Sequence, residues 1–424
     1  MVIELSDLIF TEQDDMVPEF GQDRIFNTYI ANTLAGNDRI NGYFLDHPYY
    51  NPEDHYGFKN QGVLNTDDGN DTIIGSLGYG RFGGHDNAYN IVNLGTLDTG
   101  EGDDIIQGGF QNYGSYAVYN GILNEGTLNA GEGNDTITGL GRDGYGFVNN
   151  GTVNTEDGND IITATAQNTG AFRGWPSSGF LNGEGTLNTG EGNDTISGYG
   201  SYSGYGSYGI RNNRTINTGN GDDSIISEDG FINSGGLFLG HGNDSITSTD
   251  YSDERALENF NFIGTGDGND VITSNGIIYN EGVIETGNGD DSIIVEGGVD
   301  DITGNTYSIY NNGGAINMGD GNDSIIANEG FESAPNSSGA WFLGEGDDYI
   351  LGYGSGDFYG GNGQDTLELT PGTYTVGIWG EAGESPIFTK GDQLMITSEF
   401  EKLKAGSTIY DFTSLTAGQI IIVA

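Results

Sequence analysis

The stretch TGEGNDTI at residues 189–196 contains the unit from which most of this chain is built. Gly190 and Gly192 enclose one variable residue, Asp194 closes the unit, and Ile196 follows two positions later. Nine copies keep this form and four are looser, and we call the last Asp of each copy its anchor. The anchors are Asp38, Asp71, Asp104, Asp135, Asp160, Asp194, Asp223, Asp244, Asp270, Asp291, Asp323, Asp348 and Asp365.

Three rows of residues keep a fixed distance from the anchors. An aliphatic residue stands two positions after each anchor: Ile40, Ile73, Ile106, Ile137, Ile162, Ile196, Ile225, Ile246, Ile272, Ile293, Ile325, Ile350 and Leu367. An apolar residue stands seven positions before twelve of them: Leu64, Leu97, Leu128, Val153, Leu187, Ile216, Leu237, Ile263, Ile284, Ile316, Trp341 and Phe358. From the anchor Asp71 onwards, asparagine stands eleven positions before nine anchors: Asn60, Asn93, Asn124, Asn149, Asn212, Asn233, Asn259, Asn280 and Asn312.

The length of the repeat varies in only one part. Consecutive anchors are 17 to 34 residues apart, and in the nine copies with asparagine the variation falls after the aliphatic row, as in residues 139–146. Stacked coils with a rigid cross-section and insertions at one edge show this pattern. The sequence therefore predicts an all-β fold, a parallel β-solenoid or β-roll of about 12–13 coils over residues 33–369. Residues 1–32 would form an N-terminal segment and residues 370–424 a small β-rich cap.

The rows also predict the interior. Alternation along each short strand turns one residue inward, so stacked coils would align the two apolar rows into internal ladders. The asparagine row has two interpretations. A buried stack of amides can bond to turn backbone and to each other, whereas a solvated turn also favours asparagine.

The chemistry lies in the glycine-rich turns. Paired glycines allow backbone conformations that aim carbonyls into the turn, and the anchor supplies a carboxylate. Such hard oxygen ligands suit calcium or magnesium. An ion between coils about 4.8 Å apart lies about 2.4 Å from each side, which matches Ca–O and exceeds Mg–O distances. The sequence thus predicts multiple Ca²⁺ ions with the thirteen anchors as metal ligands; a metal-free hairpin turn is the alternative.

The residue between the two glycines varies freely, as Glu101, His241, Asp267 and Asn288 show. We expect it to face solvent, which makes His241 an exposed residue rather than a ligand.

Composition agrees with a need for cations. Lys and Arg number 12 against 63 Asp and Glu, and the formal net charge is −51. This excess makes nucleic acid and anionic membranes poor partners. A hydrophobic content of 34% raises disorder as an alternative, but the strict period of the apolar residues argues against it. There is no cysteine, and no stretch is long and apolar enough to span a bilayer.

The turns resemble the RTX nonapeptide, Gly-Gly-x-Gly-x-Asp-x-U-x with U a large aliphatic. Gly192, Asp194 and Ile196 match its second invariant glycine, its calcium-binding aspartate and its core residue. The chain departs from that family because Thr usually replaces the first glycine and each coil carries only one motif, which leaves the number of ions open. A weaker similarity is to calcium-rich cyanobacterial surface proteins.

The resemblance also implies a cellular location. In that family an uncleaved C-terminal segment with an aliphatic end directs type I secretion, and residues 419–424 (QIIIVA) look similar. The N-terminus shows no basic leader and no long apolar run, so we expect export without a cleaved N-terminal signal, to the cell surface or beyond. A plain cap on the last coil would explain the same residues.

A structural protein is the functional expectation, rather than an enzyme. No His-Glu-x-x-His, Gly-x-Ser-x-Gly or phosphate-loop motif occurs. The first interpretation is a subunit that self-assembles into a filament or surface array. The second is a monomeric adhesin that binds extracellular polysaccharide through a Tyr- and Gly-rich edge (Tyr199, Tyr202, Tyr205, Tyr208). A polysaccharide-acting β-helix enzyme and an ice-binding protein with an outward Thr row are weaker alternatives.

Overall fold

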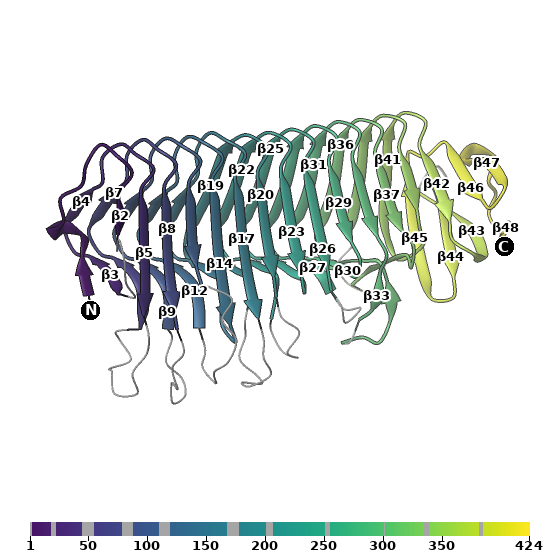
Figure 1. Ribbon diagram of the computed structural model, residues 1–424. Helices are drawn as coiled ribbons and strands as arrows, with labels where there is room; N and C mark the ends of the chain where they lie inside the picture. Colours follow the sequence, from purple (N-terminus) through teal and green to yellow (C-terminus); the bar gives the residue numbers. More distant parts are fainter. Residues whose placement is uncertain are drawn as a thin grey trace. The chain divides into compact units, whose positions relative to one another are not determined.

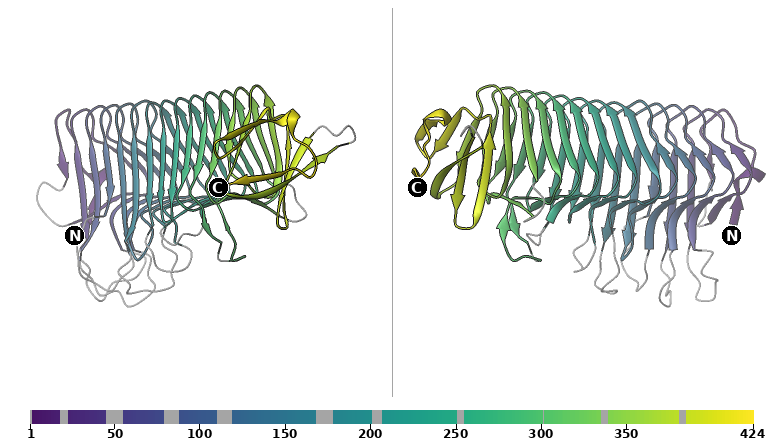
Figure 2. Two further views of the ribbon diagram at one scale, coloured as in Figure 1. Left: turned by 90° about the vertical axis from the view of Figure 1, so that its right-hand side faces the viewer. Right: turned by 180° about the vertical axis from the view of Figure 1, so that it is seen from behind.

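The protein folds into two compact units, Met1–Phe231 (unit 1) and Ile232–Ala424 (unit 2). The computed structural model describes residues 2–17, 23–44, 55–78, 88–109, 119–167, 178–200, 207–250, 255–300, 302–334, 339–380 and 385–424. Each unit is a stack of coils in which short strands form parallel rows, as Figures 1 and 2 show. The predicted all-β parallel solenoid is therefore confirmed. None of the helices among the described residues is long and apolar enough to cross a membrane.

Unit 1 contains three rows of parallel strands, and a typical coil contributes one strand to each. Row A contains β2 (Met16–Val17), β5 (Arg39–Phe44), β8 (Thr72–Leu77), β11 (Ile105–Gly108), β14 (Thr136–Arg142), β17 (Ile161–Gln167), β20 (Thr195–Tyr199) and β23 (Ser224–Glu228). Row B contains β1 (Val2–Glu4), β3 (Arg24–Asn27), β6 (Tyr56–Asn60), β9 (Ala88–Asn93), β12 (Tyr119–Asn124), β15 (Phe147–Asn149), β18 (Phe180–Asn182) and β21 (Ile210–Asn212). Row C contains β4 (Ile30–Asn32), β7 (Val63–Asn65), β10 (Thr96–Asp98), β13 (Thr127–Asn129), β16 (Thr152–Asn154), β19 (Thr186–Glu191) and β22 (Thr215–Asn220).

Unit 2 continues the same three-row pattern. Row A contains β26 (Ser245–Thr249), β29 (Val271–Ser274), β32 (Ser292–Val295), β37 (Ser324–Ala327), β40 (Tyr349–Leu351), β42 (Thr366–Leu369) and β46 (Lys402–Ala405). Row B contains β27 (Arg255–Asn259), β30 (Ile277–Asn280), β35 (Ile309–Asn311) and β38 (Phe331–Ser333). Row C contains β25 (Gly236–His241), β28 (Phe262–Asp267), β31 (Val283–Asn288), β36 (Ala315–Asp320), β39 (Ala340–Glu345), β41 (Gly356–Asn362) and β45 (Gln393–Ser398).

Several smaller elements complete the fold. In unit 1 the 3₁₀ turn η1 (Leu5–Asp7) follows β1, and β24 (Phe231–Asn233) spans the boundary of the units. In unit 2 the cap adds the antiparallel strands β43 (Gly372–Trp379), β44 (Ser385–Lys390), β47 (Thr408–Asp411) and β48 (Ile420–Val423), with η3 (Phe412–Ser414). A two-stranded hairpin, β33 (Gly298–Val299) with β34 (Thr306–Tyr307), is inserted between β32 and β35.

Strand register confirms both apolar rows. Ile106 pairs with Ile73 on one side and Ile137 on the other, and Leu97 likewise pairs with Leu64 and Leu128. All members of the two rows are at most 1% exposed. Each coil therefore adds one residue to each of two continuous apolar ladders, so the core exists only through stacking.

The asparagine row forms a buried ladder, as the first of its two interpretations proposed. In unit 1 each amide donates to the carboxamide oxygen of the next coil; the distance from Asn93 Nδ2 to Asn124 Oδ1 is 2.8 Å. The same nitrogen bonds to the carbonyl of Thr127, also at 2.8 Å. The ladder also includes Asn27, which keeps the fixed spacing from Asp38 but was left out of the row, and Asn182, which lies twelve residues before Asp194 and was missed for that reason.

One member of this row was predicted wrongly. In unit 2 the ladder residue is Asn311, which pairs in register with Asn280 and receives its amide hydrogen bond at 3.0 Å. Asn312 instead donates to the Tyr279 hydroxyl and to Glu281. The following turn, in which Gly313 adopts a φ of 80°, contains one extra residue, so a fixed count from the anchor selects the wrong neighbour.

Asn124→Asp should destabilise the protein by about 2–4 kcal/mol, because a carboxylate in the ladder has no amide hydrogens for Asn149 and Thr152 and is a buried charge. Urea unfolding at pH 7 measures this. Asn193→Asp is the matched control, since Asn193 is exposed and its side-chain oxygen accepts the N–H of Asp222 at 2.8 Å. An equal loss in both variants would contradict the ladder.

Candidate metal-binding row

The anchors lie in the turns that connect row C to row A. In the coil of Asp194 this turn follows β19 and precedes β20. Gly190 has a φ of 106° and Gly192 a φ of 132°, both in the left-handed region. A Cβ at Gly190 would lie 1.9 Å from the carbonyl oxygen of Glu156 in the preceding coil. The glycines are thus required by conformation and by the close contact of stacked turns.

The anchor side chains point into the fold and form a ladder along the stack. Asp104 is 1% exposed, and its backbone N–H donates to Oδ1 of Asp135 at 2.8 Å. The same bond recurs at 2.7–3.0 Å through both units. Each anchor carboxylate therefore holds the backbone of the coil before it. The sequence predicted the row but not this bond.

The residue before each anchor forms a second ladder in the opposite direction. The N–H of Asn134 donates to Oδ1 of Asp103 in the preceding coil at 2.8 Å, and the N–H of Asn159 donates to Asn134 at 3.0 Å. These side chains are exposed. The Asn/Asp-Asp pair in the motif thus has two separable roles, an outer acceptor for the next coil and a buried acceptor for the previous one.

The inner carboxylate oxygens of the anchors lack partners. Among the described residues, Oδ2 of eleven anchors, all except Asp223 and Asp244, is buried and makes no hydrogen bond within the usual geometric limits. A buried carboxylate oxygen without a partner is costly. Burial raises the pKa of Asp104 to about 7 and that of Asp135 to about 8, although N–H donors lower it and neighbouring anchors raise it further. The row therefore favours either protonation or a bound cation.

Nearby hydroxyls compensate for this burial only in part: burial raises the pKa of Asp71 to about 6, outweighing the contact with Thr66 that lowers it. Five residues before most anchors stands a fully buried threonine, and its hydroxyl donates to the carbonyl of the next coil, as Thr66 does to Thr99 at 3.0 Å. In other coils the position is apolar, as at Ala130 and Met318. Anchors in coils without the threonine, such as Asp135, therefore have no hydroxyl at this position to offset their burial.

The anchor carboxylates supply only some of the oxygen ligands that a bound cation would need. Among the described residues no group of three or more His, Cys, Asp or Glu side chains converges. An ion beside the anchors would use one Oδ2 from each neighbouring coil and complete its shell with turn carbonyls. With coils about 4.8 Å apart, this arrangement suits Ca–O better than Mg–O distances.

Two ladder members escaped sequence analysis. The N–H of Asp15 donates to Asp38 Oδ1 at 2.7 Å, and Met16 pairs in register with Arg39, so Asp15 occupies an anchor position. Glu401 Oε2 accepts the N–H of Asp365 at 2.8 Å. Neither lies in a Gly-x-Gly turn; the only sequence signal for Asp15 is the dipeptide Asp14-Asp15 before an apolar pair.

Other candidate positions are also located. His241 is exposed, as predicted, and its Nδ1 lies 2.9 Å from Asp267 Oδ2. Of the Tyr-rich edge, Tyr202 and Tyr205 lie outside the described residues.

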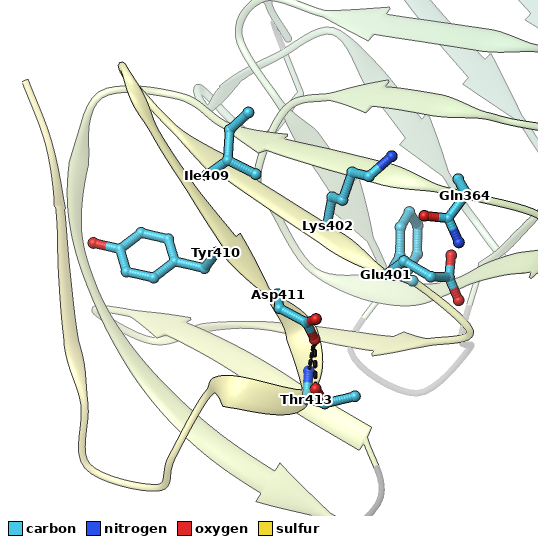
Figure 3. Close-up of a pocket in the computed structure, with 8 residues that line it drawn as sticks. Gln364, Glu401, Lys402, Ile409, Tyr410, Asp411 and Thr413 are labelled. Atoms are coloured by element: carbon cyan, nitrogen blue, oxygen red, sulfur yellow. Dashed lines mark hydrogen bonds between the residues drawn. The ribbon is translucent and has the colours of Figure 1, made fainter.

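A pocket of about 530 Å³ lies in the cap, between Glu401, Lys402, Tyr410 and Asp411 (Figure 3). Its carboxylates are engaged, because Asp411 accepts the N–H of Thr413 at 2.8 Å and Glu401 accepts that of Asp365. These bonds explain both carboxylates as structural.

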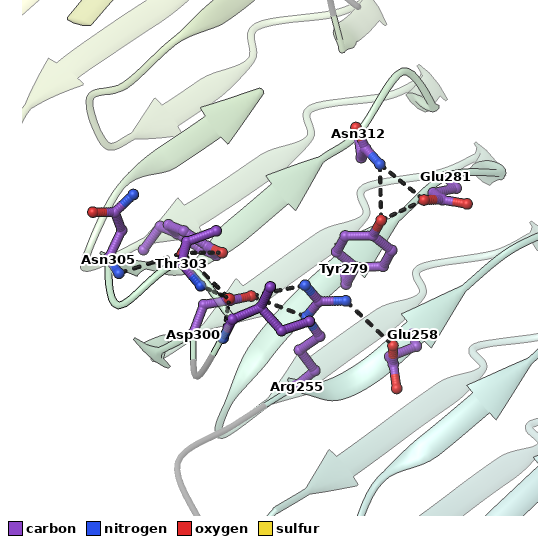
Figure 4. A network of polar contacts seen from close by, with 10 residues as sticks. Arg255, Glu258, Tyr279, Glu281, Asp300, Thr303, Asn305 and Asn312 are labelled. Atoms are coloured by element: carbon purple, nitrogen blue, oxygen red, sulfur yellow. Dashed lines mark hydrogen bonds and ion pairs between the residues drawn. The ribbon is translucent and has the colours of Figure 1, made fainter. Parts of the chain in front are cut away.

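A polar cluster fixes the inserted hairpin to row B of unit 2 (Figure 4). Arg255 Nη2 lies 2.9 Å from Asp300 Oδ2, and the guanidinium lies over the ring of Tyr279, 3.8 Å from its centroid. Asp300 also accepts the N–H of Thr303 at 2.8 Å. Burial raises the pKa of Asp300, but hydrogen bonds from Tyr307, Thr303 and Arg255 outweigh it and lower the pKa to about 2.

Asp300→Asn should destabilise unit 2 by about 2 kcal/mol, because half-buried Arg255 loses its nearest counter-charge and keeps only Glu258, whose Oε2 lies 3.5 Å from Nη1. Since the folded-state pKa of Asp300 is depressed, its stabilisation is present above about pH 4 and is lost as the pH falls towards 2. The difference between wild type and variant should therefore shrink between pH 5 and pH 2. Urea unfolding across that range measures it, and a difference that does not change with pH would contradict the assignment.

No protein-family model matches the sequence, and no curated protein matches it either. The RTX resemblance therefore rests on the turn motif alone.

Proposed function

We propose that this protein is a secreted, calcium-binding structural protein of the cell surface, with Ca²⁺ ions held between successive anchor aspartates. The observation that supports this most directly is the row of buried anchor carboxylates, in which Oδ2 atoms such as those of Asp135, Asp323 and Asp348 make no hydrogen bond. When bound, calcium would supply positive charge between carboxylates that otherwise repel each other. The protein's own residues supply the rest: the N–H groups fix Oδ1, and the glycine turns bring the carboxylates into line.

Adjacent aspartates in one turn give a matched test. Asp104 is a buried anchor, whereas Asp103 belongs to the exposed outer ladder. Asp104→Asn keeps an oxygen for the N–H of Asp71 but removes the charge beside the proposed ion. In calcium, Asp104→Asn should destabilise the protein. In EDTA, with enough trimethylamine N-oxide added to keep the ion-free chain folded, it should stabilise the protein relative to wild type, because one buried charge is gone.

Thermal unfolding followed by circular dichroism measures both signs. Asp103→Asn should show no reversal, since its carboxylate is solvated. If Asp104→Asn changed stability in the same direction with and without calcium, the ion would not sit at the anchors.

Self-assembly into a filament or array is the second part of the proposal. Row C strand β4 pairs with β7, and among the described residues no strand pairs with its other edge. Tyr29 and Ile30, at 71% and 73% exposed, lie on or beside this edge. Unpaired, apolar strand edges favour association.

Electron microscopy of the protein in calcium tests assembly. We expect ordered polymers, and Ile30→Lys should abolish them while circular dichroism stays unchanged. Exposed Ile161, 47% exposed on row A, provides the control Ile161→Lys, which should still polymerise. Monomeric wild type at all concentrations would contradict assembly and leave the calcium proposal standing.

A further inference from the structure

The outer face of row C in unit 2 carries a groove of about 470 Å³ that the anchors do not explain. Phe238 on β25 and Phe262 on β28 form one side of it, with ring centroids 5.2 Å apart. Phe238 is 42% exposed. Phe262 is half-buried. Fully buried aromatic pairs are ordinary core, but a partly exposed pair beside a groove indicates a surface that meets a ligand.

Glycines let these rings lie along the sheet. A Cβ at Gly236 would lie 2.6 Å from the ring of Phe238, and one at Gly264 would lie 2.7 Å from the ring of Phe262. Each ring therefore covers a position that has no side chain, on its own strand. The result is a low apolar platform with one side open to solvent.

Polar groups continue the groove beyond the rings. Strand register places Phe238, Gly264, Glu285 and Asn317 at one position of successive coils, followed by Phe342. Asp267, Glu285 and Asp320 line the groove itself. Four coil spacings of about 4.8 Å separate the first ring from Phe342, roughly 19 Å of alternating apolar and hydrogen-bonding surface.

The residues of this surface differ from those at the equivalent position in unit 1. The same position, six residues before the anchor, is Asn65, Asp98, Asn129, Asn154 and Asn188 in successive coils of unit 1. There the side chains bond to one another, as Asn188 does to Asn154 at 3.0 Å. Unit 2 replaces that self-satisfied polar ladder with rings, a glycine and an exposed carboxylate, so stacking of coils does not account for them.

We propose that this groove binds an extended, neutral glycan chain that runs along the stack. Aromatic faces accept the apolar C–H faces of sugar rings, and carboxylate and amide groups bond to the hydroxyls. The coil spacing of about 4.8 Å is close to the length of one sugar unit in an extended chain. The acidic lining, with Asp267, Glu285 and Asp320, repels anionic glycans and selects neutral ones.

Affinity electrophoresis in native gels with calcium tests this site. The probes are two polymers of one backbone, neutral hydroxyethylcellulose and anionic carboxymethylcellulose. We expect hydroxyethylcellulose to retard the wild-type protein and carboxymethylcellulose not to do so. The double variant Phe238→Ala/Phe262→Ala should bind at least about tenfold more weakly, the change expected for loss of one good aromatic contact.

Two further variants sharpen the result. Glu285→Gln should keep binding to hydroxyethylcellulose and begin to bind carboxymethylcellulose, because it removes repulsion and retains an acceptor. Trp379→Ala, which removes a 60% exposed ring in the cap, should bind like wild type.

Far-UV circular dichroism must be unchanged in all variants compared. Absence of retardation in wild type, equal retardation by both polymers, or undiminished binding by the double variant would each overturn the proposal. None of these outcomes depends on where calcium binds, provided that the protein is folded.

Discussion

Removal of calcium with EDTA should unfold this protein, with loss of most of its far-UV circular dichroism signal for β-sheet. Two anchor carboxylates about 4.8 Å apart repel by about 3 kcal/mol at an effective dielectric constant near 20, and the anchors form such pairs throughout each unit. A site filled at about 1,000 times its dissociation constant adds about 4 kcal/mol of stability to the folded state. A stack with many such sites therefore depends on the ion.

Adding ions back after EDTA treatment distinguishes specific calcium binding from general screening by salt. Calcium added back in small excess should restore the spectrum, whereas magnesium at the same concentration should not, because Mg–O distances are too short for two neighbouring coils. Sodium chloride at matched ionic strength controls for screening. A full β spectrum in EDTA at pH 8 would show that the ladders alone hold the coils.

The second large effect is expected from Gly131→Ala. Gly131 has a φ of 99°, and a Cβ there would lie 1.6 Å from the carbonyl oxygen of Gly100 in the preceding coil. Neither backbone can retreat without breaking the anchor bond from Asp104 to Asp135. We expect a loss of about 3 kcal/mol or more, with cooperative unfolding at lower urea concentration.

A second glycine separates the contact from conformational strain. Gly406 has a φ of 62°, but nothing lies within 4 Å of a Cβ placed there. Gly406→Ala should therefore cost only about 1 kcal/mol, the price of the left-handed conformation. If the two variants lost equal stability, close stacking of the turns would not be what selects glycine.

The sequence alone predicted those parts of the fold that follow from the regular spacing of the repeat. The aliphatic and apolar rows were aligned correctly because each coil contributes the same inward residues, and strand register repeats that alignment. The asparagine row was wrong at Asn312, where a single extra turn residue moves the role to Asn311, and it omitted Asn27 and Asn182. A count from a distant anchor cannot detect such a shift.

Other features have no signal in the repeat. The opposite roles of Asp103 and Asp104 depend on which way each side chain turns, and both are aspartates in one motif. Some glycines lie outside the anchor turns and permit a different close contact. A Cβ at Gly139 would lie 2.3 Å from the carbonyl oxygen of Gly146, where rows A and B approach each other. Composition shows such glycines but not what they touch.

The candidate site was predicted in position but not in its detail. The sequence predicted that the anchors lie in one row and that their carboxylates face a common site. It did not indicate that Oδ1 is already used by backbone N–H groups while Oδ2 is buried and unpaired. In the proposed calcium site, each anchor would therefore offer only Oδ2 to the ion, and turn carbonyls would have to complete its shell.

A crystal structure from calcium-containing solution, with anomalous scattering collected above and below a lanthanide edge after partial exchange, tests the central claim most directly. The account predicts a row of peaks between successive anchors, each within bonding distance of two Oδ2 atoms, such as those of Asp104 and Asp135. Anchors that keep their N–H bonds, with no peak beside Oδ2 and ions only on the exposed outer ladder, would contradict it.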